Sequence, residues 1–315
     1  MKELRLSVED YIELRRGLGF DLRCQAGILR DFARFAEKEK AAFVTIDLVL
    51  RWAQQAGKAL PSTIARRVSV LRRFARWLSA SDPRTQIPPE GLFPFRYQRK
   101  RPYLYSDREL RRILRGFDRL RSVTGLRRLT CKTIVALLAV TGMRISEALA
   151  LDRGDVDLEE GVLTIRHSKF GKSRLVPLHE TTCRALVVYA ERRDRLVPNA
   201  GTDAFFIAEN RRRLTAWSLQ YCFARVSQLI GIRELESDFD HGHGPRIHDL
   251  RHRFAATTLL NWYRADVDVE RELPKLSTYL GHGDPSHTYW YLEALPELLQ
   301  LATKRLMRRS REPAP

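Results

Sequence analysis

Apolar residues recur at three- and four-residue spacing through the first third of the chain, a pattern that predicts amphipathic helices. Ser7 is expected to cap the first helix, which ends near Gly17 or Gly19. Thr45 is expected to cap the third helix, and Ser62 opens the fourth. The pattern therefore predicts a four-helix N-terminal domain. Its apolar positions are Tyr11, Ile12 and Leu14, then Ile28, Leu29, Phe32, Phe35 and Ala36, then Leu48, Leu50 and Trp52, then Ile64, Val68, Val70, Leu71, Phe74 and Trp77.

The helical pattern breaks between Ser81 and Pro102, where prolines and basic residues are interspersed. Such sequence is typical of an extended linker between domains. This linker either acts as a spacer or runs across a nucleic-acid backbone. The expected division of the chain is a first domain at 1–85, a basic linker at 86–103, a second domain at 104–307 and a frayed basic tail at 308–315.

The second domain mixes helices with a single predicted β-hairpin, so the expected fold is mainly α with an α+β second domain. Thr141-Gly142 separates a buried helix from a short one, and Phe170-Gly171-Lys172 forms the hairpin turn. The glycine- and aspartate-rich stretch Ser237–Pro245 is expected to be a loop. The predicted helices are Asp107–Phe117 capped by Ser106, Cys131–Val140, Arg144–Leu151, Thr181–Arg195, Thr215–Ile230, one from His248 through Leu260, and Pro296–Met307, and the predicted strands are Val162–Arg166 and Arg174–Leu178.

Charge points to the class of partner. The chain has 56 Lys and Arg against 38 Asp and Glu, a formal net charge of +18. Such an excess favours DNA or RNA as a partner, although a general bias toward arginine would also produce it. The fourth helix carries a row of arginines that is either a solvated face or a phosphate-binding one. These are Arg66, Arg67, Arg72, Arg73 and Arg76.

The composition is that of a globular chain, with 30% charged and 44% hydrophobic residues over 315 positions, enough for two domains. No apolar run is long enough to span a bilayer, and the stretch Met1–Asp10 does not resemble a signal peptide. No cysteine pair has the CxxC spacing of a zinc ribbon, and the wide spacing fits a reducing cytoplasm. The four cysteines are Cys24, Cys131, Cys183 and Cys222.

The stretch from His248 to Tyr291 brings together side chains that need polar partners when buried. It contains His248-Asp249-Leu250-Arg251-His252, Leu280-Gly281-His282 and Thr288-Tyr289-Trp290-Tyr291. Arginine can neutralise a phosphate oxygen, imidazoles can move protons and a phenol can attack phosphorus. The set therefore suits phosphoryl transfer without a metal.

Two further sites have both a chemical and a structural interpretation. Arg144 stands at a helix start with Glu147 three residues on, which either orients a phosphate-binding guanidinium or forms an ordinary ion pair. Lys169 stands at the hairpin tip with Lys172 across the turn. Lys169 is either a general acid or one of two solvated lysines.

A metal site is an alternative use of the histidines, because His248 and His252 are four residues apart. The protease-type motif requires a glutamate after the first histidine, and here Asp249 stands there. Arg251 would also place a cation beside the metal. The phenols of Tyr289 and Tyr291 are either nucleophiles or core packing.

Taken in order, these motifs resemble the tyrosine recombinase (phage integrase) family. The resemblance covers the chain from about Tyr105 to Leu306. The N-terminal helices are in turn similar to the core-binding (SAM-like) domain of that family. The motifs are Thr141-Gly142-Met143-Arg144-Ile145-Ser146-Glu147, Ser168-Lys169-Phe170-Gly171-Lys172-Ser173-Arg174-Leu175-Val176-Pro177-Leu178, His248-Asp249-Leu250-Arg251-His252, Leu280-Gly281-His282 and Tyr291.

The resemblance implies a role for each residue. Arg144 and Arg251 would clamp the scissile phosphate and Lys169 would protonate the departing 5′-oxygen. His248 would assist proton transfer and His282 would hydrogen-bond the phosphate. The family places its nucleophile nine positions after the last histidine, which selects Tyr291 over Tyr289.

The same resemblance implies an enzyme that cuts and rejoins double-stranded DNA through a 3′-phosphotyrosyl bond, with no metal, no other cofactor and no small-molecule substrate. Its expected assembly is a homo-tetramer, or a tetramer with sister recombinases, on paired sites. The long interval between Arg251 and His282 is more similar to recombinases of transposons and integrative elements than to chromosome-dimer resolvases.

Three alternatives remain on the sequence alone. A type IB topoisomerase would share the nucleophile but relax supercoils. A DNA-binding accessory factor would lack chemistry, and a metal-dependent hydrolase would use His248 and His252. The apolar stripe of the last helix packs either on its own domain or on a neighbouring protomer.

Overall fold

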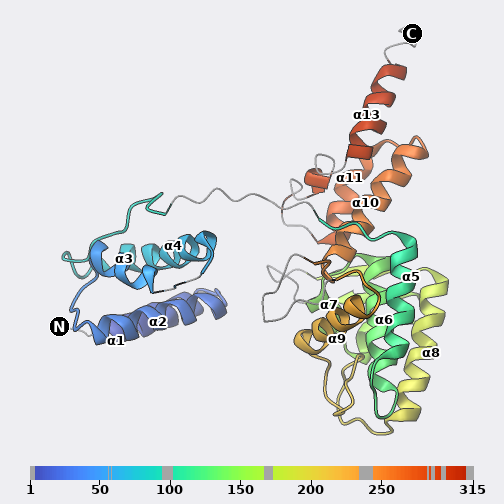
Figure 1. The fold of residues 1–315 in the computed structure, drawn as a ribbon, viewed down its shortest axis with the longest axis horizontal. Helices are drawn as coiled ribbons and strands as arrows, with labels where there is room; N and C mark the ends of the chain where they lie inside the picture. Colours follow the sequence, from blue (N-terminus) through green and yellow to red (C-terminus); the bar gives the residue numbers. More distant parts are fainter. Residues whose placement is uncertain are drawn as a thin grey trace. The chain divides into compact units, whose positions relative to one another are not determined.

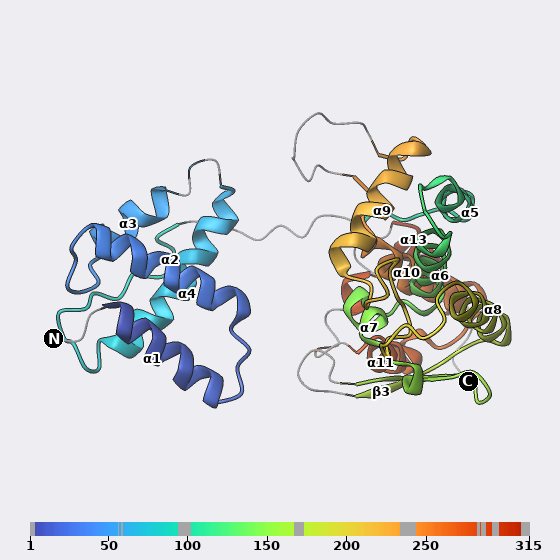
Figure 2. The same ribbon diagram turned by 90° about the horizontal axis from the view of Figure 1, so that it is seen from below.

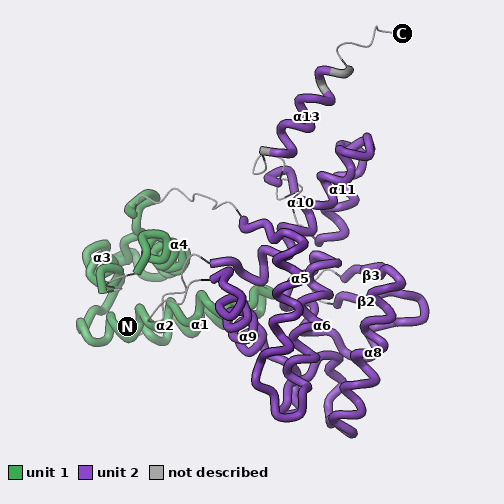
Figure 3. Tube along the Cα trace, turned by 45° about the vertical axis from the view of Figure 1, so that its right-hand side comes forward, with its two compact units in different colours: residues 1–100 green, residues 101–315 purple. Residues whose placement is uncertain are grey.

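Helices make up most of the described chain, and its strands form one three-stranded antiparallel sheet (Figures 1 and 2). This computed structural model therefore confirms the expected mainly α fold with a small sheet. The chain forms two compact units, residues 1–100 and residues 101–315, and each contains a separate hydrophobic core (Figure 3). The structure describes residues 4–55, 57, 59–93, 102–166, 173–233, 244–281, 284, 288–291 and 296–309.

The first unit is helical throughout its described secondary structure. Trp52 packs edge-on against Phe32, with ring centroids 5.3 Å apart, in the centre of its core. The guanidinium carbon of Arg67 lies 4.4 Å from the centroid of the Trp52 ring, and Arg67 forms a 2.7 Å ion pair with Asp31. The helices are α1 (Leu4–Gly17), α2 (Arg23–Lys38), α3 (Ile46–Gln54) and α4 (Pro61–Leu78).

The helix starts test the predicted caps. Thr45 accepts a hydrogen bond from the Leu48 backbone N–H, which confirms it as the cap of α3. Helix α4 begins at Pro61, one residue before the predicted Ser62, because proline suits the first helical position. The prediction for Ser7 was wrong. Helix α1 already includes Leu4, whose side chain packs into the core, so Ser7 lies buried within the helix.

Residues 79–93 fold back on the first unit after α4. The Gln86 backbone N–H donates to the Val44 carbonyl, and the Gln86 side chain accepts from the Ile46 N–H, both at 2.8 Å. Arg72 donates to the carbonyls of Pro88 and Pro89 at 2.7 Å. The described part of the predicted linker up to residue 93 thus packs on this unit, and residues 94–101 lie outside the described residues.

The second unit is built around α6, which packs against α5, α7, α8, α9 and α10 (Figure 1). Ser106 and Glu109 form a capping box at the start of α5, as predicted for Ser106. The elements are α5 (Asp107–Gly116), α6 (Leu126–Thr141), α7 (Ile145–Ala150), β1 (Val156–Asp157), β2 (Val162–Ile165), β3 (Arg174–Pro177), α8 (Glu180–Leu196), α9 (Ala216–Leu229), α10 (Asp249–Arg264), α11 (Val269–Leu280) and α13 (Pro296–Arg309), with short 3-10 turns at Phe117–Arg119 and Arg153–Asp155.

The sheet confirms the predicted hairpin strands and adds β1. Leu163 on β2 pairs with Val176 on β3 and with Val156 on β1. Leu163 and Val176 are both buried in the core of the unit. Arg174 shares the inward face of β3 with Val176, because alternate strand residues point to the same side. The predicted loop at Ser237–Pro245 falls almost entirely outside the described residues.

A second apolar cluster joins α10, α11 and the start of α13. It includes Tyr291 and Leu298, which are both almost fully buried. Arg264 forms a 2.6 Å ion pair with Glu297, so the first turn of α13 is attached to α10 of the same chain. Leu299 on the next position of α13 is exposed. Within the described residues, no helix combines the length and apolarity needed to cross a membrane.

Candidate active site

Arg144 is placed by the sharp turn between α6 and α7. Gly142 ends α6 in the left-handed region with φ 62°, and a side chain there would meet the ring of Phe254. Arg144 is the residue before α7, and its backbone N–H donates to the Glu147 carboxylate at 2.8 Å. The predicted break and the predicted short helix are therefore both present, and they fix where the Arg144 side chain begins.

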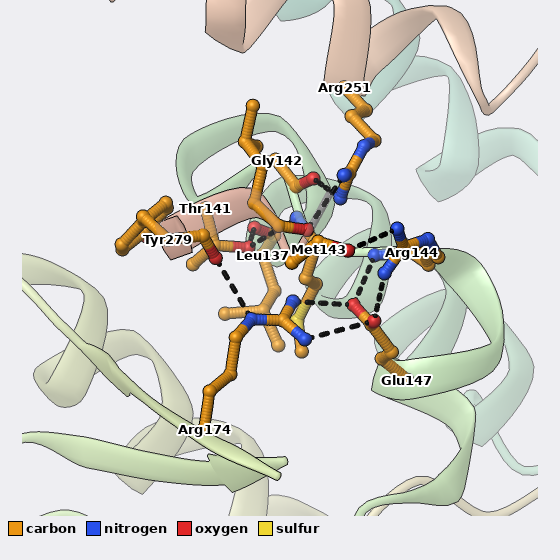
Figure 4. A network of polar contacts seen from close by, with 11 residues as sticks. Leu137, Thr141, Gly142, Met143, Arg144, Glu147, Arg174, Arg251 and Tyr279 are labelled. Atoms are coloured by element: carbon orange, nitrogen blue, oxygen red, sulfur yellow. Dashed lines mark hydrogen bonds and ion pairs between the residues drawn. The ribbon is translucent and has the colours of Figure 1, made fainter. Parts of the chain in front are cut away.

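Glu147 connects two arginines from different elements (Figure 4). Its carboxylate accepts from Arg144 Nη1 at 2.7 Å and from Arg174 Nη1 and Nη2 at 3.0 and 2.8 Å. Burial raises the pKa of Glu147, but the hydrogen bonds from Arg174 and Arg144 outweigh it and hold the pKa below its usual value. Glu147 is therefore an ionised, buried carboxylate that orients both guanidinium groups.

The three carbonyls at the C-terminal end of α11 each accept from a different arginine. Arg174 Nε donates to Tyr279 O at 2.9 Å. Arg251 Nη2 donates to Leu280 O at 2.7 Å, and Arg144 Nη2 donates to Gly281 O at 2.6 Å. Carbonyls at a helix C-terminus lack helical partners and carry partial negative charge, which suits cationic donors.

Arg251 is the most deeply buried of the three arginines, at 3% exposure. Its Nη1 also donates to Gly142 O at 2.9 Å (Figure 4). Burial, together with the neighbouring positive charge of Arg144, lowers the pKa of Arg251 to about 10. The guanidinium is still protonated at neutral pH. Three arginines and one buried carboxylate, Glu147, leave a net positive charge that suits an anion such as a phosphodiester.

His248 immediately precedes α10 and is the cap residue of that helix. Burial lowers its pKa, and the positive charge of Arg251 lowers it further. At neutral pH the imidazole is therefore uncharged and has one nitrogen able to accept a proton. The interaction with Arg251 and Arg144 places His248 within their electrostatic field.

Tyr291 lies in a short helical turn at residues 288–291 and is only 2% exposed. Its hydroxyl oxygen is 2.9 Å from Nδ1 of His252. Tyr291 and Arg251 interact electrostatically, so the phenol belongs to the same neighbourhood as the arginines. Tyr289, by contrast, is 47% exposed.

The described residues thus gather Arg144, Glu147, His248, Arg251 and Tyr291 in one part of the second unit. Lys169 and His282, the other two predicted site residues, lie outside the described residues. Nowhere in the described ranges does a group of three or more His, Cys, Asp and Glu side chains form a potential metal site.

Sequence reasoning did not include Arg174 among the site residues and considered His252 only as a metal ligand, although both carried a signal. Arg174 alternates with Val176 on the buried face of a predicted strand. His252 is three residues before Ala255 on a helix, and both are buried. A polar side chain on the apolar face of an element needs a partner inside the protein. Here the partners are two predicted site residues, Glu147 for Arg174 and Tyr291 for His252.

Known proteins are similar to this chain over almost its whole length. The model of the phage integrase family matches residues 107–297, which is more than half of the chain. The putative integrase/recombinase y4rB of Sinorhizobium fredii (strain NBRC 101917 / NGR234) is 45% identical over 317 residues, with 98% of each chain covered.

Proteins that are less similar in sequence are also named recombinases or integrases. Tyrosine recombinase XerD of Neisseria meningitidis serogroup A is 28% identical over 300 residues, covering 91% of this chain and 94% of XerD. The integrase of transposon Tn1549, solved in complex with transposon right end DNA, has the same fold with a TM-score of 0.64 at 16% identity, covering 96% of this chain and 99% of that one. This chain belongs to the phage integrase family, the tyrosine recombinases.

Proposed function

We propose that this chain is a site-specific DNA recombinase that cuts and rejoins DNA for a mobile element, with Tyr291 as its nucleophile. The observation that carries the proposal is the cluster of Arg144, Arg174 and Arg251 around one carboxylate, with a buried phenol beside it. Such a cluster offers preorganised positive charge where a pentavalent phosphate would develop negative charge.

The proposed reaction has two transesterification steps. The hydroxyl oxygen of Tyr291 attacks the scissile phosphorus, the bond from phosphorus to the 5′-oxygen breaks, and a 3′-phosphotyrosyl bond forms. A 5′-hydroxyl of the partner duplex then attacks that bond and releases Tyr291. Each step exchanges one phosphate ester for another, so no nucleotide is consumed.

Each charged residue has a proposed task in these steps. Arg144 and Arg251 bind the two non-bridging oxygens of the phosphate, and Glu147 holds Arg144 in place. Lys169 protonates the departing 5′-oxygen and His282 donates to the phosphate, as the family resemblance implies. These groups supply the charge stabilisation that Mg²⁺ provides in other phosphoryl transfers, so we propose that the reaction is metal-independent.

DNA binding is supported by the charge of the chain and by its distribution. The net charge is +18, and Arg66, Arg73 and Arg76 lie exposed on one face of α4. These three residues are spaced seven and three apart, so they share a helical face. We propose that this face contacts DNA phosphates and that four protomers, of this chain alone or with sister recombinases, assemble on two duplexes.

A role in transposition or integration is supported by the likeness to y4rB, which is named a putative integrase/recombinase, and by the shared fold with the Tn1549 integrase. Both likenesses cover nearly the whole chain. We therefore propose that the DNA ends of a mobile element are the substrate, in place of a chromosome-dimer resolution site.

The test uses a nicked suicide duplex that carries the end sequence of the element encoding the protein, incubated in EDTA and run on a denaturing gel. Wild type is expected to form a slowly migrating covalent band, and Tyr291→Phe is expected to form none. Tyr289→Phe is the matched control and should keep the band. A band that survives in Tyr291→Phe, or one that requires a divalent metal, would overturn the corresponding part of the proposal.

A second assay separates recombination from topoisomerase activity. A recombinase acts at paired copies of its site, whereas a type IB topoisomerase relaxes any supercoiled plasmid. We expect wild type to join two fragments that carry the end sequence and to leave a plasmid without the sequence supercoiled. Relaxation of the site-free plasmid would favour the topoisomerase.

A further inference from the structure

His252 is a polar residue on the buried face of α10, and it contacts the proposed nucleophile directly. Its Nδ1 is 2.9 Å from the Tyr291 hydroxyl oxygen, and the two ring centroids are 5.5 Å apart. The His252 ring also packs against Trp290 at 5.6 Å and against His248 at 4.9 Å, both edge-on. The imidazole is therefore fixed on several sides, at 9% exposure.

The direction of this hydrogen bond decides what His252 can do. If the Nδ1 nitrogen carries no proton, the Tyr291 hydroxyl donates to it and the phenolic oxygen keeps its lone pairs for attack. A free phenol has a pKa of about 10, so at neutral pH it needs an acceptor for its proton as it becomes a nucleophile. A neutral imidazole in hydrogen-bond contact meets that need.

Packing alone does not require this pair. A phenylalanine in place of Tyr291 and an apolar residue in place of His252 would fill a similar volume without desolvating a hydroxyl and an imidazole. Replacing both partners of a buried hydrogen bond by apolar groups of the same shape is often nearly neutral for stability. The presence of the pair in an apolar cluster is therefore better explained by use of the hydroxyl.

We propose that His252 positions the Tyr291 hydroxyl and accepts its proton during DNA cleavage. This inference rests on the proposed function. As the Tyr291 O–H bond breaks, an N–H bond forms at Nδ1 of His252, the phenolic oxygen bonds to phosphorus, and the departing 5′-oxygen takes a proton from the general acid, proposed to be Lys169. In the rejoining step the attacking 5′-hydroxyl gives its proton back to that general acid, the bond from phosphorus to the phenolic oxygen breaks, and the His252 proton returns to the departing phenolate.

This assignment changes the task of His248. The Tyr291 hydroxyl lies within hydrogen-bond distance of His252, and the His248 ring packs against the other imidazole, that of His252. It is coupled electrostatically to Arg251 and Arg144. His248 therefore supports His252 and the phosphate-binding arginines.

The experiment compares His252→Asn with His252→Phe in single-turnover cleavage of the nicked suicide duplex. The asparagine Oδ1 takes the place of Nδ1 and accepts a hydrogen bond but no proton, whereas phenylalanine keeps the ring shape with no acceptor. We expect His252→Phe to cleave slower by ~10²–10⁴-fold, the usual range for a general base, with unchanged DNA affinity. His252→Asn should cleave faster than His252→Phe but slower than wild type, because asparagine positions the hydroxyl without accepting its proton.

The pH dependence gives a readout that a purely structural role would not change. Without a proton acceptor, cleavage depends on ionised Tyr291, so the rate of His252→Phe should rise with pH toward the pKa of the phenol. Among the described residues, the groups near position 252 that titrate or carry charge include His248, Asp249 and Arg251 at the start of α10 and Tyr291 opposite. If His252→Phe cleaved more slowly than wild type by the same factor at every pH, His252 would have only a packing role, and the proposal would be overturned.

Spectroscopy supplies a measurement that is independent of DNA. In protein labelled with 3-fluorotyrosine, the Tyr291 ¹⁹F resonance can be assigned by its loss in Tyr291→Phe. We expect this resonance to move in His252→Phe and the ¹⁵N spectrum of His252 to show an unprotonated Nδ1. A protonated Nδ1 in the DNA-free protein, or wild-type cleavage by His252→Phe, contradicts the proposal, whereas absence of any covalent band with wild type contradicts the proposed function instead.

Discussion

Arg174 on β3 and Glu147 on α7 form a two-point ion pair, with Nη1 to Oε1 at 3.0 Å and Nη2 to Oε2 at 2.8 Å. The same carboxylate holds Arg144 at 2.7 Å. The pair therefore ties the strand that follows the hairpin tip to the helix that positions a proposed phosphate-binding residue.

Glu147→Gln is expected to destabilise the second unit strongly. The substitution leaves the partly buried guanidinium groups of Arg174 and Arg144 without their carboxylate. Breaking a buried ion pair by removing one partner typically costs ~3–5 kcal/mol. The measurement is the free energy of unfolding in denaturant. Glu180→Gln is the control, because Glu180 pairs with Arg184 at 3.6 Å on the surface, where a pair is worth about 0–1 kcal/mol. Equal effects of the two substitutions would contradict the prediction.

Acidic pH should lower the free energy of unfolding, because it protonates the Glu147 carboxylate. The pKa of Glu147 is lower in the folded chain than its ordinary value of 4.5. Its contribution to stability is therefore complete above that ordinary value and is lost as the pH falls through the folded pKa. We expect the free energy of unfolding of wild type to fall more steeply over this acidic range than that of Glu147→Gln. Parallel curves would show that Glu147 does not titrate as described.

His248 should titrate below the ordinary histidine pKa of 6.5 in the DNA-free protein, because burial and the charge of Arg251 both disfavour its protonated form. A bound phosphate brings negative charge, so its pKa should rise in the DNA complex. The measurement is an NMR titration of the His248 ring proton, assigned with His248→Gln. A folded-state pKa above the ordinary value without DNA would contradict the burial argument.

Gly281→Ala should impair cleavage more than it impairs folding. Gly281 has φ 68°, and a Cβ atom there would lie 2.9 Å from Arg174 Nη1 and 3.3 Å from Arg144 Nη1. Gly231→Ala is a matched control, because Gly231 has the same φ with open space around it. Both substitutions should cost roughly 1–2 kcal/mol for the left-handed backbone. Only Gly281→Ala should slow covalent cleavage on the suicide duplex, and retained cleavage would show that the arginines tolerate displacement.

The exposed arginines of α4 should contribute to the salt dependence of DNA binding. Replacing Arg66, Arg73 and Arg76 by glutamine should lower the slope of log affinity against log salt by about 0.9 for each phosphate that is no longer neutralised. Fluorescence anisotropy with a labelled duplex measures this slope.

The matched control removes the same formal charge elsewhere on the first unit. Arg30, Arg51 and Arg84 are exposed arginines that pair with carboxylates, so their replacement by glutamine changes net charge equally. If both triple variants lower the slope to the same extent, the effect belongs to overall charge and not to the α4 face.

Local signals predicted much of this fold. Thr45 and Ser106 were recognisable as caps, and Gly142 as a helix end, because each depends on chemistry within a few residues. Helix α11 escaped prediction because Pro274 and several charged residues interrupt its apolar spacing, although Asp268 caps it by accepting from the Glu270 and Arg271 N–H groups. The two-residue strand β1 is too short to leave a periodic signal.

The candidate site divides in the same way. Arg144, Arg251 and Tyr291 were predicted from the motifs that carry the family resemblance, and the structure brings these three residues together. Arg174 and His252 depend on contacts between residues 105 and 39 positions apart, with Tyr279 and Tyr291 respectively. No local pattern specifies which side chain will face another across such separations. Their positions on buried faces were the sole local signal.

The carbonyls at the end of α11 have a consequence for the entropy of DNA binding. An arginine side chain has about 2 kcal/mol of rotamer freedom to lose when it becomes fixed. The backbone carbonyls at the end of α11 hold the three arginines before any phosphate arrives: Tyr279 holds Arg174, Leu280 holds Arg251 and Gly281 holds Arg144. The arginines therefore lose their rotamer freedom when the chain folds and not when DNA binds. A phosphodiester that reaches this cluster therefore meets guanidinium groups already ordered, and little of its binding energy is spent on ordering them.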